Sequence, residues 1–214
     1  MSAVAVKRNY SPLLAAYLEQ LIKRPLLTKM CTAGTLSFLQ EILASHLAGA
    51  PPARLPKSSP AIAHILARSH IDLRAFKLAL YGFLISAPMG HVLVGTLQKY
   101  FAGKTGTAAK IGQILASNLI VAPIQTAVYL ASMAVVNGAK STGEIKRAVK
   151  GGYMKVLQMT WFTSPIALVV AQRFIAPELW VPFLNLVQFV MGTYVNTTMK
   201  KAKLRAENAK KDQD

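Results

Sequence analysis

The sequence is poor in charged residues, and above all in acids. Only 15% of its 214 residues are charged, and 8 acids stand against 25 Lys and Arg, which gives a net charge of +17. An ordinary soluble domain carries about 25% charged residues. Hydrophobic residues make up 53% of the chain, and the mean hydropathy is +0.36. This composition argues against a disordered chain, a coiled coil and an ordinary soluble globule.

Residues that build metal sites and active sites are also scarce. The single cysteine, Cys31, excludes an internal disulfide and a cysteine-rich zinc site. The four histidines are not spaced as metal ligands. Gly103-Lys104-Thr105 resembles the end of a phosphate-binding loop, but the first glycine of that motif would fall at Gln98. We therefore predict that the chain is not an enzyme and has no cofactor and no metal.

Long uncharged runs predict an all-α integral membrane helical bundle. An α-helix rises 1.5 Å per residue, so about 20 residues cross a hydrocarbon core of about 30 Å. Four runs without Asp, Glu, Lys or Arg approach or exceed this length: Leu78–Gln98, Ile111–Ala139, Val156–Gln172 and Leu179–Met199.

The number of spans stays open at this stage. Leu26–Ala48 is a weaker first span because it contains Glu41, which costs about 3 kcal/mol at mid-depth and should face other helices or the far interface. The last region is one span plus an interfacial piece, or two spans joined by a tight turn at Ala176–Pro182. We predict four transmembrane helices, with five as the alternative.

The remaining segments frame this bundle. Apolar residues of the first 25 recur at helical spacing and predict an N-terminal interfacial amphipathic helix, which Pro25 ends. A mitochondrial presequence is the competing interpretation. Residues 26–199 form the predicted bundle, and residues 200–214 a basic, polar tail. A short helix is expected near Ala61 in the proline-rich loop Gly49–Arg74. Lys140–Lys155 is expected to be a polar connection that forms a basic amphipathic turn of helix.

The basic residues bracket the apolar runs on both sides of the predicted membrane. This distribution favours contact with anionic lipid headgroups of the bilayer. A nucleic-acid-binding protein would gather its basic residues, interleaved with aromatics, on one exposed face. We therefore expect the lipid bilayer, and not nucleic acid, as a partner.

Polar side chains at membrane depth are the candidate functional residues, as pore-lining groups or as interhelical hydrogen-bond partners. They are Glu41, His91, Asn118, Gln125 and Gln172. Small residues spaced by four, Gly82, Ser86 and Gly90, form one stripe that suits close helix packing or a narrow pore. Three prolines predict kinks: Pro88, Pro123 and Pro165.

Several blocks of the sequence resemble the Mpv-type peroxisomal membrane protein family. The opening block carries Pro25-Leu26-Leu27-Thr28-Lys29, and the next runs from Asp72 through Lys77, Tyr81-Gly82 and Pro88 to His91. Later blocks contain Asn118, Pro123 and Gln125, and then Trp161, Pro165, Gln172, Pro177 and Asn185. The last block departs from the family pattern, since Ser164 replaces a tryptophan and Gln172 lies further from Pro165.

The resemblance implies a four-span protein of one organelle membrane without a cofactor. The family includes peroxisomal members, mitochondrial inner-membrane members and a Woronin-body sorting protein of filamentous fungi. The resemblance also implies delivery by a cytosolic peroxin receptor that recognises basic targeting signals in membrane proteins. Lys23–Lys29 and Lys140–Lys155 are basic stretches suitable as such signals. We predict a multi-pass protein of the peroxisomal membrane, with the mitochondrial inner membrane as the alternative.

Two functions remain open. The first is a channel-like bundle for small solutes, with a pore lined by His91, Asn118, Gln125 and Glu41. The second is a membrane organiser that self-assembles as a homo-oligomer and recruits partners without a pore.

Overall fold

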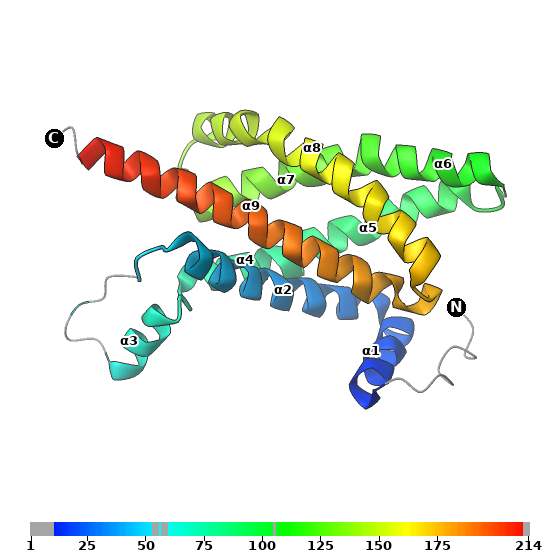
Figure 1. The fold of residues 1–214 in the computed structure, drawn as a ribbon, viewed down its shortest axis with the longest axis horizontal. Helices are drawn as coiled ribbons and strands as arrows, with labels where there is room; N and C mark the ends of the chain where they lie inside the picture. The colour runs from blue at the N-terminus through cyan, green and yellow to red at the C-terminus, as the bar shows by residue number, and fades with distance from the viewer. Residues whose placement is uncertain (1–10, 53–55, 57–59, 105, 212–214) are drawn as a thin grey trace.

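A computed structural model describes residues 11–52, 56, 60–104 and 106–211. The regular structure of these residues is helical throughout, which confirms the predicted all-α fold (Figure 1). The α-helices are α1 (Pro12–Lys23), α2 (Pro25–Ala48), α3 (Ala61–Arg68), α4 (Leu73–Tyr81), α5 (Ala87–Phe101), α6 (Thr107–Ala116), α7 (Ala122–Val136), α8 (Thr142–Phe174) and α9 (Trp180–Lys211). Two π-helical segments, η2 (Gly82–Ser86) and η3 (Ser117–Val121), and one 3₁₀ turn, η4 (Pro177–Leu179), connect some of them.

The long rods of the bundle alternate in direction. These rods are α2, the continuous α4-η2-α5, the continuous α6-η3-α7, α8 and α9 (Figure 1). Helix α9 lies along α2, α4 packs on α2, and α7 packs on α8. At one end, which we call the polar end, α2 finishes, α4 begins and the C-terminal half of α9 passes by (Figure 1).

Three continuous helical stretches are long and apolar enough to cross a membrane. Among the described residues these are Leu73–Phe101, Ile111–Val136 and Thr142–Ala171. Helices α2 and α9 do not meet the same criteria of length and composition. The total of four or five spans therefore stays a prediction.

The third stretch includes the basic segment before the apolar run. Lys140–Lys155 is helical from Thr142, as expected, but it is not a separate connection, because α8 runs on unbroken past Pro165. The side chain of Ser141 starts it by accepting the Glu144 N–H at 3.2 Å. Helix α9 follows α8 after the short turn η4, as in the alternative of two helices joined by a tight turn, but α9 already begins at Trp180.

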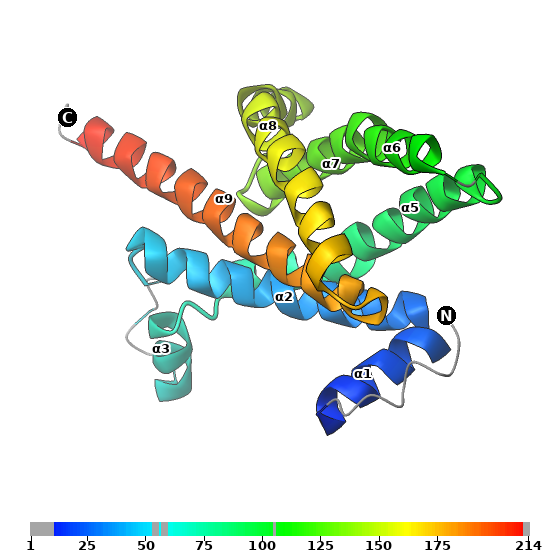
Figure 2. The same cartoon turned by 45° about the vertical axis from the view of Figure 1, so that its right-hand side comes forward.

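Within the described residues, the helix before Pro25 and the short helix of the proline-rich loop are present as expected. Residues 1–10, 53–55 and 57–59, on which parts of these predictions fall, lie outside the described residues, and the interfacial position of the N-terminal helix stays a prediction. Helix α1 ends at Lys23 and α2 begins at Pro25, so the proline separates the two helices. Figure 2 shows α1 set at an angle to α2, outside the main bundle. The short helix expected near Ala61 is α3.

The two π-helical segments end in the same way. Each is followed by Ala-Pro, within Leu-Ile-Ser-Ala-Pro at residues 84–88 and Leu-Ile-Val-Ala-Pro at residues 119–123. In each, the alanine N–H reaches back five residues, from Ala87 to the Gly82 oxygen and from Ala122 to the Ser117 oxygen. Proline has no N–H and its ring crowds the carbonyl four residues earlier. A wider π turn before each proline relieves this conflict without breaking the helix.

Large apolar side chains cover much of the outside of the bundle. Exposed examples on the membrane-length stretches are Leu80, Leu84, Ile111, Leu115, Leu119, Phe162 and Val169. A water-soluble bundle would bury this area, whereas hydrocarbon chains of lipid solvate it. The surface therefore suits a bilayer and agrees with the predicted membrane bundle.

Candidate functional site

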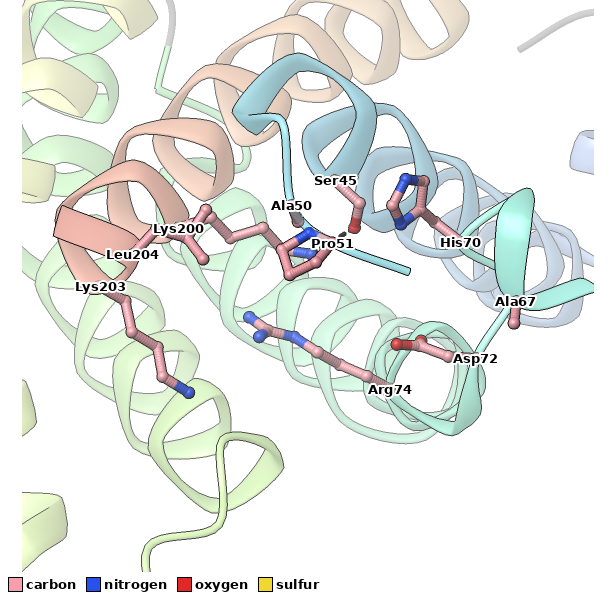
Figure 3. A pocket seen from close by; sticks show the side chains of 10 residues that line it. All are labelled: Ser45, Ala50, Pro51, Ala67, His70, Asp72, Arg74, Lys200, Lys203 and Leu204. Carbon is pink, nitrogen blue, oxygen red and sulfur yellow. Dashed lines mark hydrogen bonds between the residues drawn. The ribbon is translucent and has the colours of Figure 1, made fainter. Parts of the chain in front are cut away.

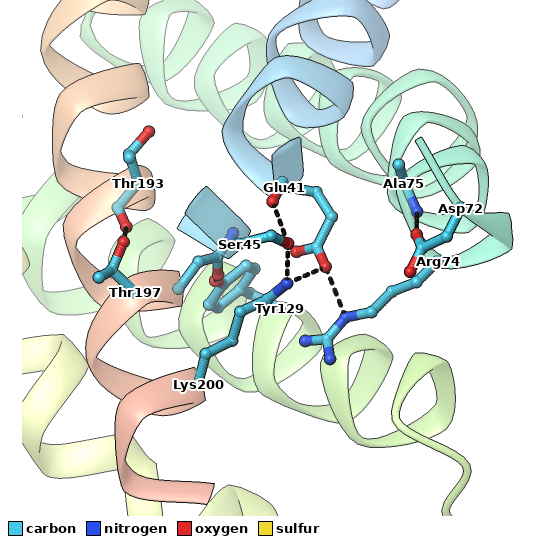
Figure 4. Close-up of polar contacts among 10 residues, drawn as sticks. Glu41, Ser45, Asp72, Arg74, Ala75, Tyr129, Thr193, Thr197 and Lys200 are labelled. Carbon is cyan, nitrogen blue, oxygen red and sulfur yellow. Dashed lines mark hydrogen bonds and ion pairs between the residues drawn. The ribbon is translucent and has the colours of Figure 1, made fainter. Parts of the chain in front are cut away.

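A buried carboxylate at the polar end joins three helices. Glu41 of α2 has no exposed surface. Its Oε1 lies 2.8 Å from Nε of Arg74 on α4 and 2.5 Å from Nζ of Lys200 on α9 (Figure 4). Lys200 Nζ also donates to the Ser45 hydroxyl, and that hydroxyl donates to the Glu41 carbonyl at 2.8 Å. We call Glu41, Ser45, Arg74 and Lys200 the ion network.

The ion network makes a charged group tolerable inside the bundle. An unpaired carboxylate in a low-dielectric interior carries a large desolvation penalty, which close cations and hydrogen bonds offset. One carboxylate faces two basic groups, so the network carries a formal charge of +1. Burial lowers the pKa of Lys200, while Glu41 acts in the opposite direction.

A cavity of about 210 Å³ opens beside the ion network. The loop after α2, the end of α3, the start of α4 and the C-terminal half of α9 surround it (Figure 3). Its lining consists of Ser45, Ala50, Pro51, Ala67, His70, Asp72, Arg74, Lys200, Lys203 and Leu204. We call it the polar-end cavity. Two of its lining groups, Asp72 and His70, are fixed by helix ends.

Asp72 is the N-cap of α4. Its side chain accepts the Ala75 N–H at 3.0 Å, which satisfies one of the free donors at the helix start. One carboxylate oxygen at the cavity is therefore already engaged with the backbone.

His70 occupies a backbone conformation that usually favours glycine. Its φ is 56°, and its N–H bonds to Ala67 while the next N–H, of Ile71, bonds to Leu66. This is a Schellman cap, which closes α3. The His70 ring lies edge-on to His46 with centroids 4.4 Å apart. Burial, with the nearby His46, lowers the pKa of His70.

The other predicted polar residues lie along α5, η3 and α7, away from the ion network. The Asn118 side-chain NH2 donates to the Ile114 backbone carbonyl at 2.9 Å, and the Asn118 backbone carbonyl accepts the Trp161 indole N–H at 2.7 Å. Asn118 Oδ1 is buried without a hydrogen-bond partner among the described residues. Gln125 Nε2 lies 3.2 Å from where a Cβ on Gly90 would stand.

His91 follows Gly90 on α5 and is half-buried. The side chain of Gln172 lies outside the described part of the structure. The structure therefore brings Gln125 to the turn that carries His91, and it places Glu41 in a different set of contacts.

The small-residue stripe serves contacts inside the chain. A Cβ on Gly82 would stand 2.5 Å from the Ala33 carbonyl oxygen and 2.6 Å from the Ser37 hydroxyl, both on α2. Gly90 meets Gln125 of α7 instead, and Ser86 ends η2. The two glycines thus face two different neighbours.

Sequence reasoning found Glu41 but missed its partners. Arg74 was placed at the end of a loop and Lys200 at the start of a tail. The available signal was the isolated acid itself, since a carboxylate in an apolar helix requires a cation from another segment. Lys200 directly follows the run Leu179–Met199, and Arg74 lies about one helical turn before the run Leu78–Gln98. A basic side chain at such a position can turn inward to the acid.

Comparison with known proteins identifies related chains. The model of the Mpv17 / PMP22 family matches residues 134–196. The chain is 50% identical over 194 residues to the Woronin body membrane protein wscA of Aspergillus fumigatus, covering 90% of this chain and 79% of that protein. It is 46% identical over 193 residues to the Woronin sorting complex protein of Neurospora crassa, covering 90% of this chain and 59% of that protein.

More distant relatives agree with the predicted membrane. The peroxisomal membrane protein PMP22 of Arabidopsis thaliana is 24% identical over 200 residues, with 92% of this chain and 95% of that protein covered. No solved structure is significantly similar to the chain. Together with the three apolar helices, these relatives confirm the predicted resemblance and a multi-pass location in the peroxisomal membrane.

Proposed function

We propose that this chain, which belongs to the Mpv17 / PMP22 family, organises the peroxisomal membrane: it self-assembles within the bilayer and recruits sorting partners, without forming a pore. One observation carries this proposal. The identity to two Woronin body and Woronin sorting proteins is roughly twice the identity to the peroxisomal membrane protein of the plant, over almost the same part of the chain. The sequence is therefore more similar to the Woronin sorting proteins than to the plant peroxisomal membrane protein of the same family.

The shape of α9 supports recruitment. This helix continues from the bundle past Lys200 to Lys211 as one element (Figure 1). Beyond the ion network it carries exposed basic residues, including Lys201 and Arg205. Because Lys200 is tied to α2 through Glu41, the bundle fixes the direction in which this basic segment projects. A basic helix held in this way suits an acidic partner surface.

The positions of the candidate pore residues also favour an organiser. Glu41, which was expected to line a path, is enclosed by Arg74 and Lys200. The glycines of the predicted self-assembly stripe contact neighbours of the same chain, so association between copies would use another face. Delivery by a cytosolic peroxin receptor belongs to the same proposal, through Lys23–Lys29 and the basic start of α8.

Self-assembly can be measured with the natural chain. Its only cysteine, Cys31, is exposed and accepts one fluorophore per copy. Donor-labelled and acceptor-labelled protein, co-reconstituted at low protein-to-lipid ratio, should show energy transfer that dilution with lipid reduces only slowly. Energy transfer no higher than expected for random mixing, at every dilution, would contradict self-assembly.

Recruitment should be tested without cutting α9 after Met199, because that cut also removes Lys200 from the ion network. The double variant Lys201→Gln/Arg205→Gln leaves the network intact. Lys99→Gln/Lys104→Gln, at exposed positions at and just after the end of α5 and outside both proposed delivery stretches, is the control with the same change in charge. We expect the α9 variant, and not the control, to lose clustering of peroxisomal cargo at patches of this protein in imaged cells. Equal clustering in all three proteins would rule out recruitment through α9.

A solute path is the second candidate, and one observation favours it. Asn118 Oδ1 is buried and unpartnered among the described residues, within the π-helical segment η3 of an apolar stretch. An unpaired acceptor at membrane depth is costly, and a passing polar solute or water could use it. Purified protein in planar bilayers should then show discrete conductance that Asn118→Leu reduces. Silent bilayers at a verified protein density would remove this candidate.

A further inference from the structure

Gln188 of α9 is an exposed amide in the middle of an uncharged run. The run Leu179–Met199 has Glu178 before it and Lys200 after it. At 1.5 Å per residue, Gln188 lies about 15 Å along the helix from the first charged residue and about 18 Å from the second. The Gln188 side chain is exposed, and its amide has no hydrogen-bond partner among the described residues.

The contacts of α9 place Gln188 at membrane depth. Met191, one turn further along α9, contacts α8, with the Thr163 hydroxyl 3.7 Å from the Met191 sulfur. Thr163 belongs to the membrane-length stretch Thr142–Ala171. Because α8 and α9 run in opposite directions on either side of η4, Gln188 lies level with the residues that follow Thr163, and these carry no charge as far as Gln172.

Helix α2 holds this turn of α9 without using the Gln188 side chain. Helix α9 lies along α2 (Figure 1), and Gln40 Nε2 donates to the backbone carbonyls of Gln188 and Phe189 at 3.2 and 3.3 Å. The same Gln40 side chain fills the space at Gly192, where a Cβ would stand 2.5 Å from its nitrogen. The turn is therefore fixed before any association, which lowers the entropic cost of a contact made there.

A second amide shares this face of α9. Asn185 precedes Gln188 by three residues, so the two side chains leave the helix on the same side. Asn185 is half-buried, and its amide likewise has no hydrogen-bond partner among the residues that the structure describes. An amide that faces hydrocarbon gives up its hydrogen bonds to water and gains none from lipid tails. Such a group is satisfied by a polar side chain of another helix.

We propose that Gln188 is a contact through which two copies of this chain associate in the membrane, with the two Gln188 amides bonded to each other across a twofold axis. An amide carries two donors and an acceptor, so it is complementary to its own copy. Copies inserted in the same orientation place Gln188 at the same depth, which a second copy ensures and an unrelated protein does not. This inference rests on the proposed self-assembly and names a contact that produces it.

The first test measures energy transfer between full-length copies labelled at Cys31, in liposomes over a series of lipid dilutions. Gln188→Leu removes the amide but no hydrogen bond within the chain, so the fold is retained. Gln158→Leu is the matched control, because it makes the same change at another exposed glutamine that lies three residues from Lys155 and hence near the headgroups. We expect Gln188→Leu to weaken association about tenfold, the effect of losing interhelical amide bonds, and Gln158→Leu to weaken it less than about twofold.

Failure of this contact and failure of self-assembly give different results. Energy transfer at the level of random mixing in the parent protein contradicts self-assembly itself, and this contact with it. Energy transfer in the parent that Gln188→Leu leaves unchanged, or that both variants weaken equally, overturns the contact and leaves the proposed self-assembly standing. Lipid or a different protein then covers Gln188.

A second test checks the twofold arrangement, in a chain that carries Cys31→Ser. Leu184→Cys introduces a thiol one turn before Gln188 on the same face of α9, and Leu186→Cys introduces one on the opposite face, where the leucine is 58% exposed. Two like cysteines reach disulfide distance only near a twofold axis. Oxidation in liposomes should therefore cross-link the Leu184→Cys protein in preference to the Leu186→Cys protein, and adding Gln188→Leu should reduce the cross-link. Equal cross-linking at the two positions, or none with Leu184→Cys, overturns the proposal.

Discussion

The polar end and the middle of the bundle hold their helices together by different means. At the polar end, three helices meet at one carboxylate and two basic side chains. In the middle, η2 packs against α2 at Gly82, where the added Cβ would stand 2.5 Å from a backbone oxygen. Ion pairs hold the helices together in the first region. In the second, the helices pack closely because glycine has no side chain to keep their backbones apart.

The difference follows from the surroundings of each region. Transferring a charged group into hydrocarbon costs free energy. The Glu41 carboxylate lies instead where three helices and a polar cavity surround it. Within the apolar middle, no hydrophobic force drives helices together, and association relies on close backbone approach at small residues. The two regions should therefore respond differently to mutation.

Removing the carboxylate of Glu41 should have the largest effect. Glu41→Gln leaves Arg74 and Lys200 buried without their anion, and breaking a buried ion pair in this way costs about 3–5 kcal/mol. Denaturant unfolding of the purified protein in detergent micelles measures the loss. Replacing all three charged residues at once, with Glu41→Leu, Arg74→Leu and Lys200→Met, should cost less than the single change. A triple variant less stable than Glu41→Gln would contradict this account.

Adding a methyl group at Gly82 should have the next largest effect. Gly82→Ala drives the new Cβ into the Ala33 carbonyl and the Ser37 hydroxyl, and overpacking of this kind costs about 1–3 kcal/mol. Gly95→Ala is the matched control, since nothing lies within 4 Å of its Cβ position. Alanine there should stabilise helix α5 by about 0.5–1 kcal/mol. The same unfolding assay should thus give opposite signs, and equal signs would argue against the close approach of η2 and α2.

Removing the N-cap of α4, also at the polar end, should have a smaller effect on stability. Asp72→Ala removes the acceptor of the Ala75 N–H, and loss of such a cap costs about 1 kcal/mol. Asp72→Asn removes the charge but keeps an oxygen acceptor, so it should retain most of the stability. If both variants lose the same amount in thermal unfolding, the charge of Asp72 matters and the cap does not.

The smallest expected effect is the pH dependence from His70. Its folded-state pKa is lowered by burial and by the nearby His46 and Lys200, with Asp72 and Glu41 acting oppositely. The unfolded chain then binds a proton more readily, so the contribution of His70 is complete above about pH 6.5 and is lost as pH falls through the folded pKa.

His70→Asn tests this contribution, because asparagine tolerates the positive φ and does not titrate. The melting temperature of the parent should fall more between pH 7.5 and pH 5.5 than that of the variant. Identical pH profiles would show that His70 contributes nothing to the pH dependence.

The sequence by itself determined the class of this protein. Uncharged runs such as Leu78–Gln98 are long enough to cross a bilayer. The core of a bilayer holds no water for the backbone N–H and C=O groups to bond with, so these groups must bond to each other within helices. Pro25 and the apolar spacing before it likewise predicted the break between α1 and α2. These features are local, and each is set by residues within one or two helical turns.

Only the tertiary structure decided how the functional groups combine. Glu41, Arg74 and Lys200 lie far apart in the sequence, and the crossing of α2, α4 and α9 brings them together. The same crossing forms the polar-end cavity and separates Glu41 from His91, Asn118 and Gln125, which the sequence had grouped as one path. No local pattern encodes this arrangement, because the charge of a side chain specifies that it needs a partner but not which helix supplies it.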